Sequence, residues 1–476
     1  MAWRIVKNTF IFLFTIMVVI CVSPAVVSAR SIQGDSVGPV HTVSGAANVN
    51  SILKKAAAEN GVSLQDAIQS AMDANPTFLS RKHAYSSSRE AYLKSFGALL
   101  PQVNLLVKGG YQVIQNDTTS VIYDDKRGEG WTNDMRVVMS QLLFDGGMTR
   151  SKVEAGKLHS QSKKEELFNT AEDVGLTATQ YFMEVIRNRA LIELCEDNIV
   201  EHEKILELTR IRLNNGGGTL VDVNQAEASL EEAKSRMVQA RQGLEDAEAG
   251  YLKVFGSKAD KLAMPERPTQ AIPQTVEEGI ALAMDNNRAL KAARMAIEQK
   301  KREAESAKGQ HMPQLYAKLS GGHSDNTGGY EQNYHDVSAM LQLSFNLYSG
   351  GSVSAAIREA KSEVSRSVQE AEEVRRAVEE DVRTAYSFHQ ATWKLIPVLR
   401  DLTNENADVV VSYADQFRMG KRTLLDLISA QKSLFSSQQV YLNAMTAHTF
   451  SYYRICMPVS SLLTTLNVKV DVPNLE

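Results

Sequence analysis

The chain has 476 residues, of which 43% are hydrophobic and 23% are charged, and its formal net charge is −4. This is the composition of a folded protein, and it lacks the basic excess that nucleic-acid binding requires, so no nucleic-acid partner is expected. HExxH, GxSxG, Walker A and CxxC motifs are absent, and the nine histidines show no ligand spacing. The sequence therefore predicts neither an enzyme nor a cofactor or metal site.

The N-terminus has the pattern of an export signal. A basic start is followed by an apolar run from Phe10 to Val22 and by small residues ending at Ala29. This order is typical of a secretory signal peptide over residues 1–29. Residues 30–62 are rich in Ser, Gly and Val without a sustained period, and we predict a flexible N-terminal extension there.

Export leaves two cysteines, Cys195 and Cys456, in an oxidising compartment. Measured from the ends of the long helical hairpins described below, their positions differ by roughly 20 Å, at about 1.5 Å per helical residue. That separation is too large for a disulfide. We predict two buried free thiols.

The chain contains an internal duplication, with halves at 63–264 and 275–457. A capped helix start, a Pro-Gln pair and a Gly-Gly pair recur in the same order. The Pro-Gln pairs end at Gln102 and Gln314, and 314 − 102 = 212; the Gly-Gly pairs end at Gly147 and Gly351, and 351 − 147 = 204. The halves therefore differ in length by 8 residues, between these two markers.

Between the markers the hydrophobic period is two, which is typical of β-strands. Each half therefore predicts one β-hairpin, at 102–145 and at 314–348, with strands of about ten residues. The loops are polar and aromatic, at 124–134 and 324–336. One face of each hairpin is apolar, and it is built from Val103, Leu105, Val107, Tyr111 and Val113, and from Val337, Ala339, Leu341, Leu343, Phe345 and Leu347.

The rest of each half is helical. From Gly147 to Asn214 there is no proline, and apolar residues recur every seven positions. A sustained 3.5-residue repeat predicts supercoiled helices, and some 65 helical residues span on the order of 100 Å. Pro397 is expected to kink or interrupt the second long helix. A Pro-rich linker, 265–274, is expected to cross the outside of the helices, and residues 458–476 form a C-terminal tail.

The strictest repeat lies on the helix that returns from the first turn. Its core positions alternate spacings of three and four residues: Val223, Ala226, Leu230, Ala233, Met237, Ala240, Leu244, Ala247, Tyr251 and Val254.

Each long helical hairpin turns at a glycine. The turns lie at 214–219 and 418–423, and Thr219 and Thr423 begin the return helices. The three consecutive glycines of the first turn follow a helix and not a strand, which predicts a turn and not a phosphate-binding loop.

After the signal peptide, no apolar run approaches the roughly 20 residues that a membrane helix requires. A membrane-spanning form would therefore be a closed barrel, in which every backbone group is paired. Four strands cannot close one, because the smallest membrane barrels have about eight, so such a barrel implies an oligomer. Alternation alone fits a soluble β-sandwich equally well, but export and the very long amphipathic helices favour the membrane.

The signal peptide, the duplicated halves, the LFDGG and LYSGG motifs and the two turns TLVDVNQA and TLLDLISAQKSL together resemble TolC-like outer-membrane efflux proteins, over roughly 63–457. The resemblance implies an α+β membrane protein that forms a homotrimer. Twelve strands, four per chain, would form one open β-barrel among outer-membrane lipids. A coiled-coil α-barrel would continue the pore through the periplasm to a periplasmic adaptor and an inner-membrane transporter.

The same resemblance implies a gate at the turns. Asp426 matches a pore-lining acidic ring, Arg422 a locking arginine and Asp222 its acceptor. Ser429 replaces a second acidic ring, and Phe417 replaces a tyrosine that contributes a hydroxyl. An equally simple role for Asp222 and Asp426 is to complement the dipoles of the helices that they begin. The expected adaptor contacts at the turns are Gly216, Gly217, Gly218, Gly420 and Lys421.

The resemblance leaves the cargo open. One-step (type I) protein secretion is favoured, and multidrug or other small-molecule efflux is the alternative. A periplasmic coiled-coil adaptor is a second alternative, but two helical hairpins duplicated around β-hairpins argue against it.

Overall fold

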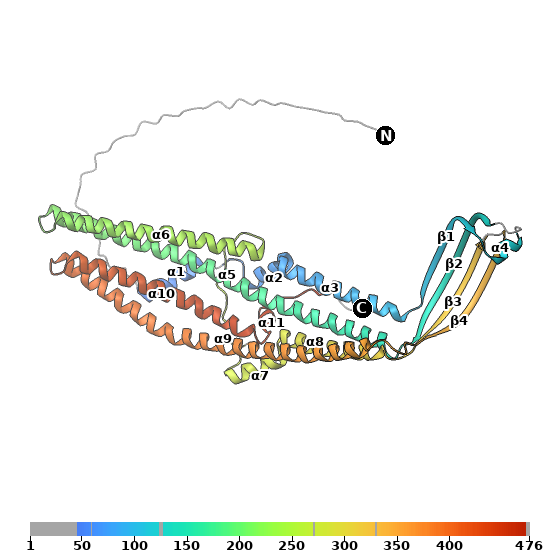
Figure 1. Ribbon diagram of the computed structural model, residues 1–476. Helices are drawn as coiled ribbons and strands as arrows, with labels where there is room; N and C mark the ends of the chain where they lie inside the picture. Colours follow the sequence, from blue (N-terminus) through green and yellow to red (C-terminus); the bar gives the residue numbers. More distant parts are fainter. Residues whose placement is uncertain (1–44, 59, 123–126, 270–271, 329–330, 473–476) are drawn as a thin grey trace, which may run out of the picture. The chain divides into compact units, whose positions relative to one another are not determined.

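The computed structural model describes residues 45–58, 60–122, 127–269, 272–328 and 331–472 (Figure 1). The predicted signal peptide and the first part of the predicted extension lie outside these residues. The described residues belong to one unit of the chain.

The order of elements repeats once (Figure 1). The first half comprises α2 (Leu64–Ala74), α3 (Pro76–Phe96), a 3-10 turn (Gly97–Leu99), β1 (Gln102–Ile114), α4 (Asp117–Ile122), β2 (Gly128–Phe144), α5 (Met148–Asn214) and α6 (Leu220–Phe255). The second half comprises α7 (Val276–Asn286), α8 (Arg288–Gly309), β3 (Gln314–Asp325), β4 (Asn333–Ser344), α9 (Ser352–Arg418) and α10 (Leu424–Cys456). Two short helices lie outside the repeat, α1 (Ala46–Ala56) and α11 (Leu462–Thr465).

The two longest helices show the duplication most directly. Both α5 and α9 have 67 residues, and their first residues are 352 − 148 = 204 positions apart. Each starts after a glycine in the left-handed region, Gly147 and Gly351, both with φ of 82°. Glycine adopts this conformation without steric cost, which is why both motifs end in Gly-Gly.

The four strands form one antiparallel sheet in the order β1-β2-β3-β4. The strands have 13, 17, 12 and 12 residues, more than the ten predicted. The predicted loop at 124–134 was wrong from Gly128 onward, because β2 already begins there. The polar residues Thr132 and Asp134 suggested a loop. They lie instead on the polar face of β2, which pairs with β1 as far as Ile114.

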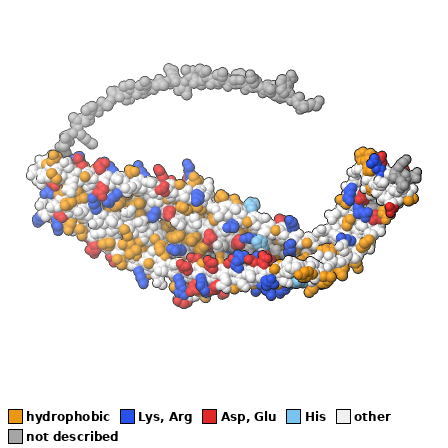
Figure 2. Space-filling model, in the orientation of Figure 1, with side chains coloured by type: hydrophobic (Ala, Val, Ile, Leu, Met, Phe, Trp, Pro, Cys, Tyr) orange, Lys and Arg blue, Asp and Glu red, His pale blue; other side chains and the backbone are white. Residues whose placement is uncertain are grey.

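The two faces of the sheet differ as the alternation predicts. Hydrophobic side chains are exposed over the sheet, with Val337 86% and Val107 65% accessible (Figure 2). On the opposite face, the Arg136 guanidinium donates to both carboxylate oxygens of Asp336, each at 3.0 Å. Gly322 lies between them, and an added methyl group there would approach Asp336 Oδ1 to 2.8 Å. This ion pair therefore reaches from β2 to β4 across a glycine of β3.

Two helix pairs carry the coiled coil, α5 with α6 and α9 with α10 (Figure 1). Of the ten predicted core positions on α6, nine are buried, and Leu244 is partly buried. His202 of α5 is 3% exposed and shares a 3.1 Å hydrogen bond with Ser229, and burial lowers its pKa to about 4. Among the described residues, no helix combines the length and apolar character that crossing a membrane requires.

The two cysteines and Pro397 have clear outcomes. Cys195 and Cys456 are free and buried, which confirms the prediction. Pro397 does not interrupt α9, which continues to Arg418. Proline removes one backbone hydrogen bond, but most helix stability in a protein comes from tertiary packing, and α9 packs against α10.

The prediction of a flexible segment at 30–62 was wrong for its second part. α1 is a helix whose buried side chains include Val49, Ile52 and Leu53. They join the core cluster that also contains residues of α5 and α10. A helix of 11 residues is too short to show a sustained period, so only its packing reveals it.

The linker between the halves packs across the second helical hairpin. Pro273 accepts a hydrogen bond of 2.7 Å from the Tyr386 hydroxyl of α9. Arg267 donates to Thr449 of α10 over 3.2 Å, and the Tyr453 hydroxyl donates to the carbonyl of Glu266. Linker residues therefore bind both long helices of the second half.

The C-terminal tail docks on α5 through a buried carboxyl group. Glu172 is 5% exposed, and it accepts a hydrogen bond of 3.3 Å from the backbone N–H of Leu463. Burial raises the pKa of Glu172 from 4.5 to about 7, against the smaller opposing effects of this hydrogen bond and of Arg288.

Replacing this carboxyl group should change the pH dependence of the protein's stability. A folded-state pKa above the unfolded value means that stability is complete below pH 4.5 and is lost as the pH rises through about 7. The glutamine of Glu172→Gln stays neutral at every pH. At pH 8 the free energy of unfolding of this variant should therefore exceed that of the wild type by about 3 kcal/mol. Thermal unfolding between pH 5 and pH 8 measures this. The exposed Glu196→Gln variant is the control, and parallel pH profiles for wild type and Glu172→Gln would contradict the prediction.

Candidate functional site

The two hairpin tips have the same backbone geometry. At the end of α5, the N–H of Gly216 donates to Leu213 O at 3.0 Å, and the N–H of Gly217 donates to Arg212 O at 2.9 Å. At the end of α9, Gly420 and Lys421 make the equivalent bonds at 3.0 and 2.8 Å. This is the Schellman ending, which places a left-handed residue after the helix. Gly216 and Gly420 have φ of 75° and 74°, so both tips need glycine there.

Each return helix starts with a capping box. The backbone N–H of Asp222 donates to the Thr219 hydroxyl, and the Asp222 carboxylate accepts from the Thr219 N–H at 2.9 Å. Asp426 and Thr423 repeat this arrangement at 3.2 Å. Hydrogen bonds from Thr423 hold the pKa of Asp426 below its usual value. The helix-start role considered for both aspartates is thus observed.

A groove of about 450 Å³ lies between the tips and is lined by residues of both. Arg212 of the first tip reaches the second: its Nη1 donates to Phe417 O at 3.1 Å, and its guanidinium lies 4.5 Å from the centre of the Phe417 ring. The Phe417 side chain is 2% exposed. The Phe417 ring therefore offers an aromatic face that binds a cation.

Arg422 contacts its own hairpin. Its Nε donates to Gln416 at 2.9 Å, and its guanidinium lies 4.4 Å from the centre of the Tyr413 ring. Asp426 Oδ2 is 4.0 Å from Nη1. Arg422 and Asp222 line the same groove, but in the described part of the chain no interaction joins them.

Sequence reasoning missed Arg212 and Tyr413. The available signal for Arg212 was a basic residue in the last turn of a helix, which is common because it complements the helix dipole. The duplication does not single out Arg212 either, because the equivalent position in the second half, 212 + 204 = 416, is a glutamine. Only the packing of the two tips identifies Arg212 as their link.

The residues at the tips are mostly exposed to solvent. Gly216, Gly217, Gly420, Lys421 and Ser429 are exposed, and Gly218 is partly exposed. Large apolar side chains lie beside them, with accessibilities of 64% at Leu220, 71% at Val221, 60% at Met419 and 56% at Leu425. Apolar side chains grouped at one end of a helical structure are typical of a contact surface for another protein.

Residues 67–257 and 279–452 match the family described as "Outer membrane efflux protein". The chain belongs to this family. Both halves of the duplication are included in the match, whereas α1 precedes it. The family consists of transport ducts and not enzymes, which confirms the prediction of no catalysis.

Several characterised proteins are similar along most of their length. The outer membrane efflux protein BepC of Brucella suis is 26% identical over 71% of this chain and 73% of its own. The outer membrane protein TolC of Vibrio cholerae is 24% identical over 84% and 91%. The alkaline protease secretion protein AprF of Pseudomonas aeruginosa is 22% identical over 82% of both chains.

Solved structures share the fold. A membrane protein from Pseudomonas aeruginosa superposes with a TM-score of 0.75 at 15% identity, over 83% of this chain and 90% of that one. The outer membrane protein VceC from Vibrio cholerae superposes with a TM-score of 0.71 at 15% identity, over 85% and 96%. The predicted TolC-like fold class is therefore confirmed, and the chain is an outer-membrane protein that extends into the periplasm. Family membership also sets aside the alternative of a periplasmic adaptor.

Proposed function

We propose that this outer-membrane exit duct of a tripartite export system serves type I protein secretion. The supporting observation is its similarity, across 82% of both chains, to a protein named for alkaline protease secretion. A second relative, from Dickeya chrysanthemi, is named for proteases secretion. Small-molecule efflux is the second candidate, because BepC is named as an efflux protein.

The cargo is tested in a deletion strain. Loss of one or more secreted proteins from the medium, with unchanged drug sensitivity and restoration by the wild-type gene, is the expected result. Drug sensitivity with an unchanged set of secreted proteins would reject protein secretion in favour of small-molecule efflux.

The duct is proposed to be a homotrimer in outer-membrane lipid. The sheet has two long edge strands, β1 and β4, and an unpaired edge exposes a row of backbone donors and acceptors. In lipid these groups need partners, so the edges must pair with other copies. Three copies supply 3 × 4 = 12 strands, above the roughly eight that the smallest membrane barrels have.

The tips are the proposed contact for a periplasmic adaptor and, beyond it, an inner-membrane transporter. Leu220 and Val221 at one tip and Met419 and Leu425 at the other give each hairpin an exposed apolar end. The tip glycines lack side chains, which lets a partner approach the backbone closely. Gly218 and Lys421 also line the groove between the tips.

We propose that Arg422, with Asp222 on the first-half tip, helps to hold the pore entrance closed. Arg422→Ser removes a charge-assisted hydrogen bond to Gln416, a kind of bond that contributes about 1.5–3 kcal/mol, and a cation–π contact with the Tyr413 ring. The variant should therefore show a higher single-channel conductance in planar bilayers. Arg210→Ser, which removes an exposed ion pair with Glu227 inside the first hairpin, is the control. Conductance equal to wild type in Arg422→Ser would reject the lock.

Asp426 is proposed to form a cation-attracting ring, one copy per subunit. Asp426→Ala should weaken block of the channel by multivalent cations, because three carboxylates leave the entrance. Glu231→Ala is the control, since it removes an exposed carboxylate of the first hairpin that pairs with Lys234 and takes no part in the proposed gate. If both variants are blocked as strongly as wild type, Asp426 only caps its helix.

A further inference from the structure

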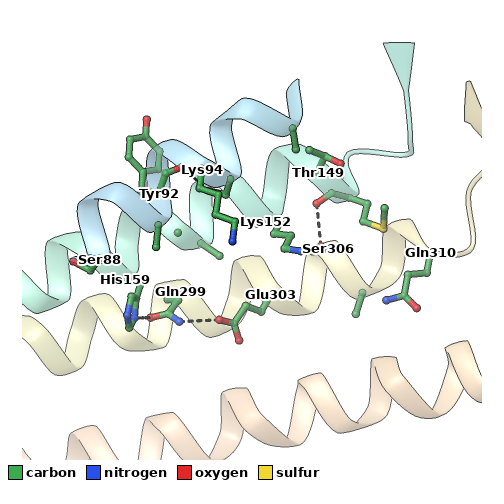
Figure 3. Close-up of a pocket in the computed structure, with 17 residues that line it drawn as sticks. Ser88, Tyr92, Lys94, Thr149, Lys152, His159, Gln299, Glu303, Ser306 and Gln310 are labelled. Carbon is green, nitrogen blue, oxygen red and sulfur yellow. Dashed lines mark hydrogen bonds between the residues drawn. The ribbon is translucent and has the colours of Figure 1, made fainter. Parts of the chain in front are cut away.

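Two histidines of the sheet are hydrogen-bonded to each other. Other histidines have a polar partner of a different kind: His159 lies in the pocket lined by α3, α5 and α8, where its ring shares a hydrogen bond of 3.2 Å with Gln299 (Figure 3). Within the described residues, His323 and His335 are the two histidines that share a hydrogen bond directly, Nδ1 to Nδ1 at 3.2 Å. This pair takes no part in the tips or in the helical core.

The register of the second β-hairpin brings these two rings together. The residues are 335 − 323 = 12 positions apart, which is not a ligand spacing along one strand. In the antiparallel pairing of β3 with β4, however, His323 lies directly opposite His335. Residues in such positions lie on the same face of the sheet, with Cβ atoms about 4.5–5.5 Å apart. The two rings stack, with centres 4.4 Å apart and planes at 20°.

The pair lies at the end of the sheet that is away from the helices. β3 leads from α8 towards the histidines, and β4 leads from them back towards α9. Because the helices form the periplasmic part of the protein, this end of the sheet faces the outside of the cell. The apolar side chains on this face of β3 and β4 end at Leu319 and Val337. Farther out, the face carries one glycine and four polar residues: Gly321, His323, Asp325, Asn333 and His335.

The distance between the two ring nitrogens fits two ligands of one metal ion. An imidazole nitrogen binds Zn²⁺ at about 2.0–2.1 Å, so two nitrogens on one ion lie about 2.9–3.4 Å apart at square or tetrahedral angles. The 3.2 Å between Nδ1 of His323 and Nδ1 of His335 lies within this range. The χ2 torsion of histidine is broad, so rotation about it turns both lone pairs from the stacked arrangement towards a common point.

A carboxylate selects the ring nitrogen of His323 that is free to bind. Asp325 Oδ2 lies 3.3 Å from His323 Nε2. This favours a proton on Nε2 and leaves the lone pair on Nδ1, as in the carboxylate–histidine–metal arrangement of known metal sites. His335 is exposed, so water can carry its proton from Nδ1 to Nε2. Both Nδ1 atoms then offer a lone pair, and neither ring has gained or lost a proton.

We propose that His323 and His335 bind one divalent transition-metal ion at the outer end of the sheet, with Asp325 orienting His323 and water completing the coordination. Imidazole suits Zn²⁺, Ni²⁺ and Cu²⁺, and Cu²⁺ binds most tightly of the three. Mg²⁺ and Ca²⁺ prefer oxygen ligands and are excluded. In the described ranges no group of three or more His, Cys, Asp or Glu residues could hold a metal ion, so this two-histidine site binds an exchangeable ion and not a structural one.

Titration with Cu²⁺ tests the site. Untagged protein purified from outer membranes in detergent should bind Cu²⁺ in calorimetry, and His323→Ala and His335→Ala should each weaken this binding at least tenfold. Asp325→Asn keeps both ligands and should weaken it about tenfold. His83→Ala is the matched control, because it removes an exposed histidine of α3, and it should bind as the wild type does. Equal Cu²⁺ binding by the wild type and both histidine variants of the sheet would overturn the proposal.

The spectrum of the bound ion identifies its ligands without any variant. Electron paramagnetic resonance of one Cu²⁺ per chain should show coupling to two nitrogens, and excess Mg²⁺ should leave the spectrum unchanged. A spectrum without nitrogen coupling would overturn the proposal. So would displacement of the copper by Mg²⁺, because it would place the ion on carboxylates, such as those at the tips.

Discussion

Gly146→Ala should lose about 2–5 kcal/mol of stability, the sum of about 1–2 for a left-handed residue and about 1–3 for overpacking. Gly146 has φ of 66°, and the added methyl group would lie 2.3 Å from Met312 Cβ. That carbon is attached directly to the backbone, so rotating the Met312 side chain cannot move it away. Urea unfolding of the detergent-solubilised protein measures the loss.

Gly147→Ala is the matched control for this prediction. Gly147 also has a left-handed backbone, with φ of 82°, but no atom lies within 4 Å of its added methyl group. Gly147→Ala should lose only the stability that a left-handed backbone costs a residue with a side chain, about 1–2 kcal/mol. Equal losses in the two variants would show that the contact with Met312 does not limit the approach of the two halves.

Ile52→Asp should detach α1 from the long helices. Ile52 is 4% exposed in the core, so the change loses about 2–5 kcal/mol of apolar packing and buries an unpaired carboxylate as well. The polar contacts of α1 and its start, Ala46 N to Asn404 at 3.0 Å, Asn48 to Asp197 at 3.1 Å and Lys55 to Glu193, cannot offset this loss. We expect trypsin to cleave at Lys54 and Lys55 at least tenfold faster.

Ala47→Asp is the control, because Ala47 lies on the exposed side of the same helix. It introduces the same charge without burying it, and its cleavage rate should match wild type. Cleavage of Ile52→Asp at the wild-type rate would mean that α1 is held by its polar contacts with α5 and α9 and not by its apolar face.

α1 contacts both halves of the duplication. Its polar contacts extend to Asp197 of α5 and Asn404 of α9. Gly45 lies so close to α9 that an added methyl group would meet Asn404 Oδ1 at 2.6 Å. A segment that precedes the family match therefore ties the first helical hairpin to the second.

The tips show how far the candidate site could be read from sequence. The glycines and threonines predict both turns, because a left-handed helix ending and a capping box each depend on a few adjacent residues. Which side chain bridges the two tips depends on residues 205 positions apart, Arg212 and Phe417. No local pattern encodes that pairing, and within one chain Arg422, the arginine predicted from resemblance, contacts its own hairpin.

Local sequence patterns predict most elements of this protein: long helices from a 3.5-residue repeat, strands from alternation, turns from glycine, and two halves from constant offsets. These features are local or periodic, so neighbouring residues suffice to specify them. Three features follow only from the folded structure: α1 is a helix, Glu172 is buried with a raised pKa, and Arg212 links the tips. Each of these depends on what distant segments place around a side chain, and solvent exclusion and close packing exist only once the chain has folded.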